Sequence, residues 1–461
     1  MEISTQKESE RFSSFLDEEN NINIIFSGMF GIGKTYFIHQ FFDNKKDKYL
    51  PIYLNPVQYT VSNNEDIFEY IKVDILFGLM ESGVNFEKTN FSFGKCVQMY
   101  LKENPGTFIV SLLKKVEKLG FRTDIIKSVF DLHKAIESYK EKLNLNEEEI
   151  VNAFLHTHKE KIGSIYEDNM ITELIRSFVD YLQSDNKEVV LIIDDLDRID
   201  PEHIFRILNI LSVHENFCGK KEENKFGFDK TILICDIDNI KNIYSAKYGI
   251  KVDFNGYIDK FYSKNIYYFD NTSEIINAIF NILLSLTHDN PDIGLNTTTT
   301  VAFKACNTLL SALVKSNGIN LRCLLRYENK PFDNRRQIII EEENVRASNY
   351  PCLNIFDFIK SIFATLQDFE KAIYNLKDAN FDLYKIDNLL SVFFPLADYP
   401  QNKFKPGNYN YNGTDYSINQ FYADCGMSYF GSDPHTKEIV KNISFSEIIK
   451  KAFYNYKNYF I

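Results

Sequence analysis

The first 270 residues alternate between short apolar runs and longer amphipathic segments. The runs are rich in β-branched residues and are followed by polar or glycine-rich stretches, which is typical of buried strands. They cover residues 21–27, 49–55, 188–194, 231–235 and 265–269. Helical spacing predicts helices over 36–42, over 65–80 and from Pro201. We therefore predict an α/β fold in which these strands form a parallel sheet.

The pattern changes in the second half of the chain, where strand-like runs give way to helical spacing. Residues 273–329 are predicted to be helical, 331–336 form a polar break, and 354–376 form one long aromatic-rich helix. Residues 399–434 are dense in Asn, Gly, Pro and Tyr, which predicts a loop or a run of short irregular elements. The second half is therefore expected to be mostly α-helical.

The length of 461 residues allows two to four structural units. We predict a core over 1–285 that contains a large helical insertion at about 64–182. A helical lid is expected over 286–345, followed by a C-terminal helical domain of unassigned role over 346–461. We find no internal repeat.

Composition narrows the class of protein. The chain is 44% hydrophobic and 25% charged, which fits a globular protein and excludes fibrous, collagen-like and wholly disordered chains. Acidic residues outnumber basic ones by 64 to 52, giving a net charge of −12. A protein built mainly to bind nucleic acid or anionic lipid usually leans basic, so this balance argues against both as principal partners.

The chain carries no apolar segment that resembles a signal peptide, and no run of 18 apolar residues that could span a bilayer as a helix. Its seven cysteines are scattered and never form a C-x-x-C pair. This predicts reduced thiols and a cytoplasmic location, without a disulfide framework or a zinc site.

A glycine-rich loop joins the first predicted strand to the first predicted helix. Its sequence, Gly28-x-x-x-x-Gly33-Lys34-Thr35, fits the Walker A pattern. The glycines let backbone N–H groups curve around a β-phosphate, and the next helix directs its positive dipole end at the same anion. Lys34 would reach the β- and γ-phosphates, and the Thr35 hydroxyl is a ligand for Mg²⁺. The residues predicted to bind the nucleotide are Gly28, Met29, Phe30, Gly31, Ile32, Gly33, Lys34, Thr35 and Tyr36.

A second candidate motif follows the apolar run at 188–194, which ends in the string Asp194-Asp-Leu-Asp-Arg198. A Walker B strand has this form, because its last residue emerges at the carboxyl end of the sheet, where ligands bind. Asp194 would hold Mg²⁺ through water, and Asp195 is placed to polarise an attacking water. A solvated acidic turn after a core strand is the alternative, which the upstream Walker A loop disfavours.

Arginine is scarce, at ten of the 52 basic residues, so each one near a motif is of interest. Arg198 has two interpretations, a local pair with a neighbouring aspartate or an arginine finger that reaches a nucleotide in another subunit. Arg322 and Arg326 lie four apart on one predicted helix face, which suits a lid that closes over a γ-phosphate. An ordinary surface pair is the equally weighted alternative. Arg335 and Arg336 are expected to lie in a solvated loop.

The sequence resembles the KAP family of P-loop NTPases over roughly residues 10–330. The resemblance rests on 28–35, 194–198, 257–261 with the strand that follows, and Asn320-Leu-Arg322 with Arg326. It implies an additional-strand sheet, in which one strand separates the Walker A and Walker B strands. It also implies ATP and Mg²⁺ as ligands and a sensor-like lid position for Arg322.

This chain departs from many members of that family, which carry transmembrane helices between Walker A and Walker B. Here the insertion is long but is expected to be soluble and helical, which puts membrane attachment in doubt. Prokaryotic members of the family include phage-defence proteins, so the resemblance suggests a role in antiviral defence.

Three functions remain open at this stage. The favoured one is a Mg²⁺-dependent ATPase that acts as a regulatory switch through a protein partner or self-association. A non-catalytic ATP-binding scaffold is the first alternative, although it would not need the second carboxylate, Asp195. A nucleic-acid-dependent ATPase is the second, because lysines such as Lys114, Lys118 and Lys127 could follow a phosphate backbone. Interleaved glutamates and the acidic net charge disfavour it.

Overall fold

The computed structural model divides the chain into two compact units. The N-terminal unit consists of Gln6–Met29 and Lys34–Phe269, and the second contains Asp270–Ile461 with the loop tip Phe30–Gly33. The described residues are 5–59, 67–82, 132–134, 170–183, 186–215, 226–290, 293–381, 386–401, 404, 407–411, 414–418, 427–429 and 444–461. The predicted division of the second half into a lid and a C-terminal domain stays a prediction.

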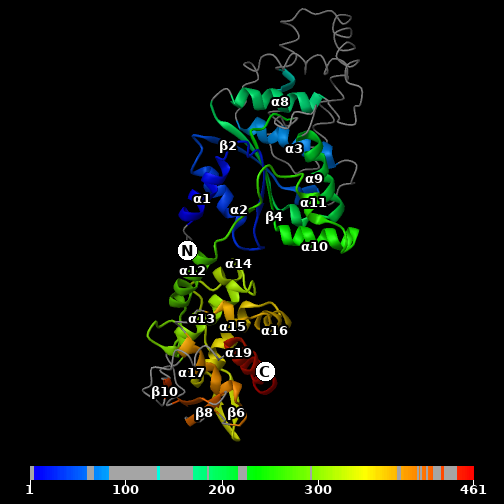
Figure 1. Cartoon of the computed structure of the whole chain (residues 1–461). Coiled ribbons are helices and arrows are strands. Elements are labelled where there is room, and N and C mark those ends of the chain that lie inside the picture. The colour runs from blue at the N-terminus through cyan, green and yellow to red at the C-terminus, as the bar shows by residue number, and fades with distance from the viewer. Residues whose placement is uncertain are drawn as a thin grey trace, which may run out of the picture. The chain divides into compact units, whose positions relative to one another are not determined.

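The N-terminal unit is built on a five-stranded parallel sheet in the order β2-β3-β4-β1-β5 (Figure 1). Its strands are β1 (Asn23–Ser27), β2 (Tyr49–Leu54), β3 (Glu188–Ile193), β4 (Lys230–Cys235) and β5 (Tyr267–Tyr268). β4 lies between β1, which precedes the Walker A loop, and β3, which precedes the Walker B aspartates. The additional-strand arrangement implied by the resemblance is therefore confirmed.

The edge strand β5 is shorter than the run at 265–269 predicted. It pairs only with the last two residues of β1, so Phe26 lies opposite Tyr267 and Ser27 opposite Tyr268. Phe269 follows the strand, and its N–H still donates to the Ser27 carbonyl at 2.7 Å. Its ring packs near that of Phe26, with centroids 5.4 Å apart. An apolar run can thus be longer than the strand that it supplies.

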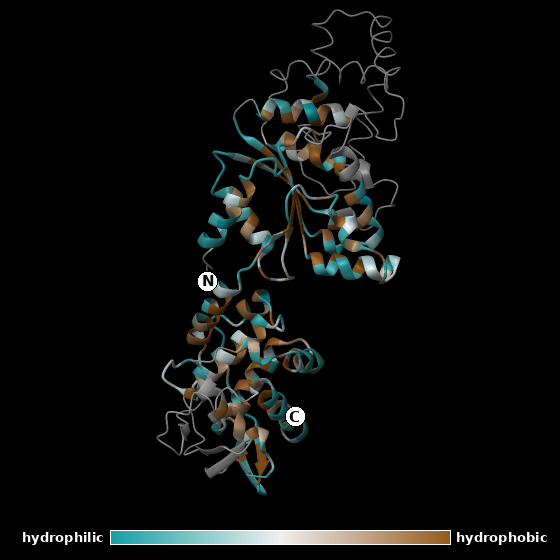
Figure 2. Ribbon diagram, in the orientation of Figure 1, coloured by the Kyte–Doolittle hydropathy of each residue, from teal (hydrophilic) through white to brown (hydrophobic). Residues whose placement is uncertain are grey.

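Helices cover both faces of this sheet. Those described in the unit are α1 (Gln6–Leu16), α2 (Lys34–Asp43), α3 (Ile67–Glu81), α8 (Met170–Gln183), α9 (Pro201–Glu215), α10 (Ile237–Tyr248) and α11 (Phe254–Ile258). In Figure 1, α1 and α2 lie on one side of the strands, while α3, α8 and α9 lie on the other. Because both faces are buried, the strands read as nearly continuous apolar runs, and Figure 2 shows them mostly brown.

The two faces have different cores, because successive side chains of a strand point in opposite directions. Phe26 of β1 faces α1 and α2, with its ring 5.1 Å from Phe12 and 5.8 Å from Phe37. Ile25 joins a largely aliphatic core with α3, α8 and α9. The aromatic core holds the helix that follows the Walker A loop tightly against β1, since Phe37 is almost fully buried.

The predicted insertion at about 64–182 is described only at its ends and at 132–134. The first described helix, α3, contacts the last, α8, and both contribute to the aliphatic core. Lys114, Lys118 and Lys127, which supported the nucleic-acid hypothesis, lie outside the described residues. No helix in the described part of the chain has the length and apolar character needed to cross a membrane.

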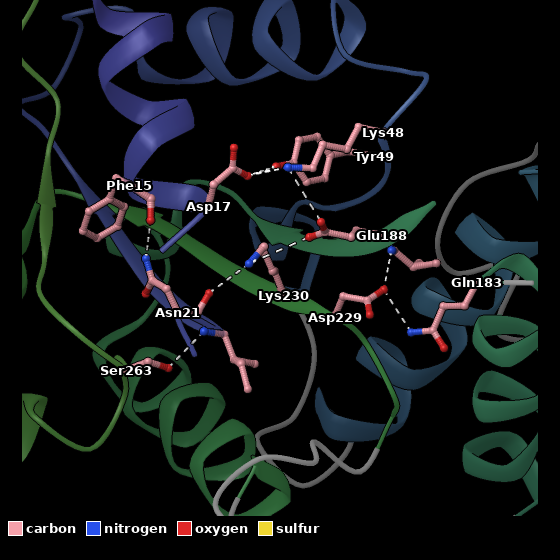
Figure 3. Close-up of polar contacts among 12 residues, drawn as sticks. Phe15, Asp17, Asn21, Lys48, Tyr49, Gln183, Glu188, Asp229, Lys230 and Ser263 are labelled. Atoms are coloured by element: carbon pink, nitrogen blue, oxygen red, sulfur yellow. Dashed lines mark hydrogen bonds and ion pairs between the residues drawn. The ribbon is translucent and has the colours of Figure 1, made fainter. Parts of the chain in front are cut away.

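Alternating charges link the strands where they begin, an edge that we call the amino edge (Figure 3). Lys48, just before β2, lies 2.5 Å from Asp17 and 3.9 Å from Glu188 at the start of β3. Lys230, at the start of β4, lies 3.8 Å from Glu188 and donates to the backbone carbonyl of Asn21 at 3.3 Å. The contacts therefore run from α1 through β2, β3 and β4 to the residues before β1.

The second unit is mainly helical. Its described elements include α12 (Thr272–Ser285), α13 (Val301–Lys315), α14 (Leu321–Leu325), α15 (Pro351–Ile362), α16 (Leu366–Tyr374), α17 (Ile386–Ala397) and α19 (Phe445–Phe460). The prediction of one helix over 354–376 was wrong, because Phe363–Thr365 separates α15 from α16. The Thr365 hydroxyl accepts a hydrogen bond from the backbone N–H of Asp368 at 3.1 Å, and this N-cap starts a new helix.

Strands in the second unit were not predicted. β6 (Gln337–Ile340) and β7 (Glu343–Arg346) form an antiparallel hairpin, whose turn residues Glu341 and Glu342 both have positive φ. Such a turn favours Asn and Gly, so its sequence gives no hairpin signal. Part of 399–434 forms the antiparallel sheet β8 (Gly407–Tyr411), β9 (Thr414–Ile418) and β10 (Met427–Tyr429), rather than only loops or irregular elements.

The expectation that Arg335 and Arg336 both lie in a solvated loop was wrong for Arg336. Arg335 is exposed, but Arg336 lies 2.7 Å from Asp357 of α15. The same carboxylate accepts hydrogen bonds from the Tyr456 hydroxyl at 2.5 Å and from Asn334 Nδ2 at 2.7 Å. Arg336 thus joins the segment before β6 to α15 and α19, because a half-buried carboxylate there requires a cation.

Candidate functional site

The Walker A loop is shaped around the side chain of Lys34. Gly31 and Gly33 have φ values of 75° and 102°, which side chains other than glycine rarely adopt. Lys34 begins α2 and is buried, and its ammonium donates to the carbonyls of Gly28 at 2.6 Å and Met29 at 3.1 Å. The loop therefore already holds a positive charge within its curve.

Glycine is favoured at position 28 because neighbouring atoms leave little space for a side chain, and not because of its φ value. A Cβ atom at this position would lie 3.2 Å from Cδ of Lys34 and 3.3 Å from the carbonyl oxygen of Phe269. Its backbone N–H donates to the carbonyl of Cys235, the last residue of β4, at 3.1 Å. The loop thus leaves the sheet directly beside the end of β4.

The Walker B aspartates follow β3 directly. The Asp194 N–H donates to Leu54 of β2 at 3.0 Å, which continues the sheet pairing by one residue. Asp194 Oδ1 then accepts a hydrogen bond from the Asp195 N–H at 2.7 Å. Asp195 has φ 54° and ψ 34°, a left-handed conformation that aspartate tolerates better than most residues. The chain therefore turns sharply as it leaves the sheet, and the two carboxylates hold different positions.

Arg198 forms the local ion pair that was one of its two interpretations. Its Nη1 lies 2.9 Å from Asp195 Oδ2, and its N–H donates to the Asp195 carbonyl at 3.1 Å across a 3₁₀ turn (Leu196–Arg198). The buried side chains of Leu196 and Ile199 hold this turn against the core.

A comparison with protein families decides the assignment. The family model for the KAP family P-loop domain matches residues 6–339. The chain belongs to the KAP family. Membership supports a P-loop NTPase that binds and hydrolyses a nucleotide, and it covers both motifs just described. No curated protein matches the chain significantly.

In this KAP protein two further carboxylates join the Walker B pair: Asp197, which belongs to the string 194–198, and Asp236, which the sequence analysis had not singled out. Asp236 follows β4 and caps α10, accepting a hydrogen bond from the Asp238 N–H at 3.1 Å. Asp197 is buried and accepts a hydrogen bond from Asn239 Nδ2 at 3.3 Å. The position of Asp236 directly after an apolar run, like that of Asp194, was the signal that could have found it.

These carboxylates share one electrostatic environment with Lys34. Burial raises the pKa of Asp195, the charge of Asp194 raises it further, and Arg198 lowers it in part. Burial likewise raises the pKa of Asp236, although the hydrogen bond from the Asn239 backbone opposes this. For both groups the charge of Asp197 raises the pKa and that of Lys34 lowers it. We call this side of the sheet, where the strands end, the carboxyl edge.

The residues of the carboxyl edge fit a Mg²⁺–nucleotide complex. The crowding of like charges that raises the pKa of Asp195 is the kind that a bound divalent cation relieves. Hydroxyl and carboxylate oxygens, as on Thr35 and Asp194, are the donors that Mg²⁺ prefers. No cluster of three or more His, Cys, Asp or Glu among the described residues could hold a metal by itself. Mg²⁺ commonly reaches such sites with phosphate and water as its remaining ligands.

The remaining residues predicted to bind the nucleotide differ in exposure. Thr35 is exposed in the first turn of α2, and Tyr36 and Phe30 expose 53% and 47% of their surface. Ile32 is buried. Exposed rings here could meet a base, whereas Ile32 can act only through its backbone. Their contact with a nucleotide stays a prediction.

Arg322, the KAP lid residue by resemblance, lies on the short helix α14. This helix starts at an Asn320 N-cap, whose Oδ1 accepts a hydrogen bond from the Cys323 N–H at 3.0 Å. Arg322 is exposed, and its guanidinium carbon lies 5.8 Å from the ring centroid of Phe30, a member of the same compact unit. Arg326 ends the helix as its C-cap. A role of Arg322 in sensing a γ-phosphate stays a prediction.

The second unit also contains a cavity of about 420 Å³ between α16, α17 and α19. Its lining mixes two lysines, two carboxylates and several aromatic residues, and Lys450 already pairs with Glu447 at 3.0 Å. Balanced charges of this kind select neither an anion nor a cation. The chemistry that can act on a nucleotide is therefore concentrated at the carboxyl edge.

Proposed function

We propose that this KAP protein binds ATP with Mg²⁺ at the carboxyl edge and hydrolyses it. The observation that carries the proposal is that Lys34, which follows β1, and Asp194 and Asp195, which follow β3, lie at the same edge of the sheet, with only β4 between their strands. A cation inside a glycine loop and clustered carboxylates beside it are complementary to a phosphate chain and its metal.

Each residue has a distinct role in the proposal. Lys34 exchanges its contacts with the carbonyls of Gly28 and Met29 for β- and γ-phosphate oxygens. Thr35 and Asp194 hold Mg²⁺, which supplies positive charge to the phosphate oxygens. Asp195 orients a water molecule in line with the γ-phosphate and accepts its proton. Of the two carboxylates, Asp195 suits this task because Asp194 Oδ1 already accepts the Asp195 N–H.

We further propose that hydrolysis serves as a regulatory switch, in keeping with the antiviral role suggested by the resemblance. A long insertion between α3 and α8 and a second compact unit supply surface for recognising a partner. A slow ATPase whose nucleotide state changes its assembly or partner contacts would use both.

Steady-state ATP hydrolysis by the purified full chain with Mg²⁺ tests the proposal. The wild type should hydrolyse ATP, Lys34→Ala should bind ATP more weakly and lose turnover, and Asp195→Asn should bind ATP without hydrolysing it. Lys46→Ala and Asp47→Asn are matched controls, because both residues are exposed and lie outside the site. No turnover in the wild type, with tight ATP binding that depends on Lys34, would favour the scaffold instead.

A further inference from the structure

Arg198 and Asp195 lie on one rigid turn. The turn is closed by the hydrogen bond between the Arg198 N–H and the Asp195 carbonyl at 3.1 Å. It is anchored on either side by Leu196 and Ile199, which are 1% and 5% exposed. The two side chains therefore project from a backbone that has little freedom to separate them.

The ion pair between these side chains joins Arg198 to one oxygen of the Asp195 carboxylate. Arg198 Nη1 lies 2.9 Å from Oδ2 of Asp195, whereas Oδ1 has no hydrogen-bond partner within the described part of the chain. Their side chains are 34% and 20% exposed, so water can reach the pair. A carboxylate held at one oxygen leaves the other available to a reactant.

Asp195 needs an opposing cation because neighbouring carboxylates repel its charge. The carboxylates of Asp194 and Asp197 flank it in sequence, and its own backbone is left-handed. Without an opposing cation, repulsion would turn the side chain of Asp195 toward solvent by rotation about χ1. An arginine three residues ahead on the same turn supplies that cation within the same chain.

We propose that Arg198 is a positioning residue that acts in cis, holding Asp195 Oδ2 so that Oδ1 points at the attacking water. This rests on the proposed function and adds to it the means by which Asp195 is oriented. The same contact argues against a role of Arg198 as an arginine finger, since contacting a nucleotide in another subunit would require Arg198 to leave Asp195.

The test compares kcat with nucleotide affinity in Arg198→Ala, Arg198→Lys and the matched control Arg206→Ala, an exposed arginine on α9. We expect Arg198→Ala to lower kcat about 10- to 100-fold, because small misplacements of a reacting group have effects of this size. The Kd of the ATP complex should change less than about twofold, since Arg198 does not touch the nucleotide. Arg198→Lys should recover part of kcat, because one charged contact is needed rather than a fork.

Mixing distinguishes cis from trans action. Lys34→Ala subunits keep Arg198 but should not hydrolyse ATP themselves, so an excess of them added to Arg198→Ala would restore turnover if Arg198 acted in trans. We expect no restoration. Recovery on mixing, an unchanged or raised kcat in Arg198→Ala, or an equal loss in Arg198→Lys would each overturn the proposal.

A measurement without turnover separates this inference from the proposed function. Thermal unfolding midpoints of Asp195→Asn, Arg198→Ala and the double variant report whether the two side chains interact within one chain. We expect effects that are not additive. If the wild type hydrolyses no ATP, the proposed function fails. If the changes in midpoint of the two single variants add up to that of the double variant, the pairing of Arg198 with Asp195 in cis is overturned as well.

Discussion

The two edges of the central sheet are built from the same residue types but arranged in opposite ways. At the amino edge, Lys48 and Lys230 alternate with Asp17 and Glu188, so each charge meets an opposite one. At the carboxyl edge, among the residues that the structure describes, four aspartates gather around two cations, Lys34 and Arg198. Paired charges suit a structural edge, whereas an excess of carboxylates suits an edge that binds a divalent cation.

The pKa values reflect the same contrast. Although partial burial opposes it, hydrogen bonds from Lys48 and Tyr49 lower the pKa of Asp17 at the amino edge. At the carboxyl edge burial and like charges raise the pKa of Asp195. The surroundings of Asp17 favour its charged form, whereas those of Asp195 disfavour its charged form. Strain concentrated at one edge of an otherwise well-paired sheet is typical of a functional site.

The largest effect is expected from Lys34 at the carboxyl edge. Lys34→Ala removes the charge that would meet the phosphates, and should weaken nucleotide binding about 10- to 100-fold. Equilibrium binding of a fluorescent ATP analogue measures this, with Lys46→Ala as the control. Equal affinities in the two variants would remove the functional distinction between the edges.

The next effect in size concerns the stability of the amino edge. Asp229 Oδ2 accepts hydrogen bonds from the Val189 N–H at 2.7 Å and from Gln183 Nε2 at 2.9 Å. Asp229→Ala leaves the Val189 N–H without this acceptor and removes one of two hydrogen bonds of Gln183 Nε2, which keeps the one to the Gly227 carbonyl at 2.9 Å. It should lower the free energy of unfolding by about 1–3 kcal/mol. Chemical denaturation checks this against Asp47→Ala. Nucleotide affinity should stay the same, and a large loss of affinity would mean that the amino edge is more than structural.

A smaller effect of opposite sign is expected from Asp194. Asp194→Asn keeps the oxygen that accepts the Asp195 N–H but removes one of the crowded charges. Without nucleotide, it should raise the free energy of unfolding by roughly 0.5–1 kcal/mol, as relief of strain at functional sites often does. Denaturation in the absence of Mg²⁺ measures it, and a destabilised variant would contradict the crowding described above.

The smallest effect is expected from Glu188, its counterpart at the amino edge. Glu188→Gln removes a charge that lies 3.9 Å from Lys48 and 3.8 Å from Lys230. These pairs are long and partly exposed, so the free energy of unfolding should fall by no more than about 0.5 kcal/mol. The same denaturation experiment tests it. A rise in stability like that expected for Asp194→Asn would mean that the two edges do not differ in charge crowding.

The sequence predicts the site better than it predicts the second unit. The motifs at 28–35 and 194–198 combine strand, loop and residue type, so the sheet positions that carry them could be inferred. The pairing of Arg198 with a neighbouring aspartate was one of two interpretations, but the left-handed conformation of Asp195 could not be inferred, because it becomes visible only with the backbone. Asp236 was missed because no motif marks it, although it too follows an apolar run.

In the second unit, local signals conflicted with the hydrophobic period. Helical spacing continues across Phe363–Thr365, yet the Thr365 cap divides it into α15 and α16. The hairpin β6–β7 turns through two glutamates with positive φ, which no turn preference anticipates. Arg336 became an anchor through Asp357, a partner 21 residues away that sequence spacing alone does not indicate.

Binding of a non-hydrolysable ATP analogue, measured with and without Mg²⁺, tests the difference between the edges most directly. The proteins to compare are the wild type, Asp194→Asn and Glu188→Gln. We expect Mg²⁺ to tighten binding in the wild type and in Glu188→Gln, and to have little effect in Asp194→Asn. The same response to Mg²⁺ in all three proteins, or none in the wild type, would contradict the assignment of the carboxyl edge as the Mg²⁺–nucleotide site.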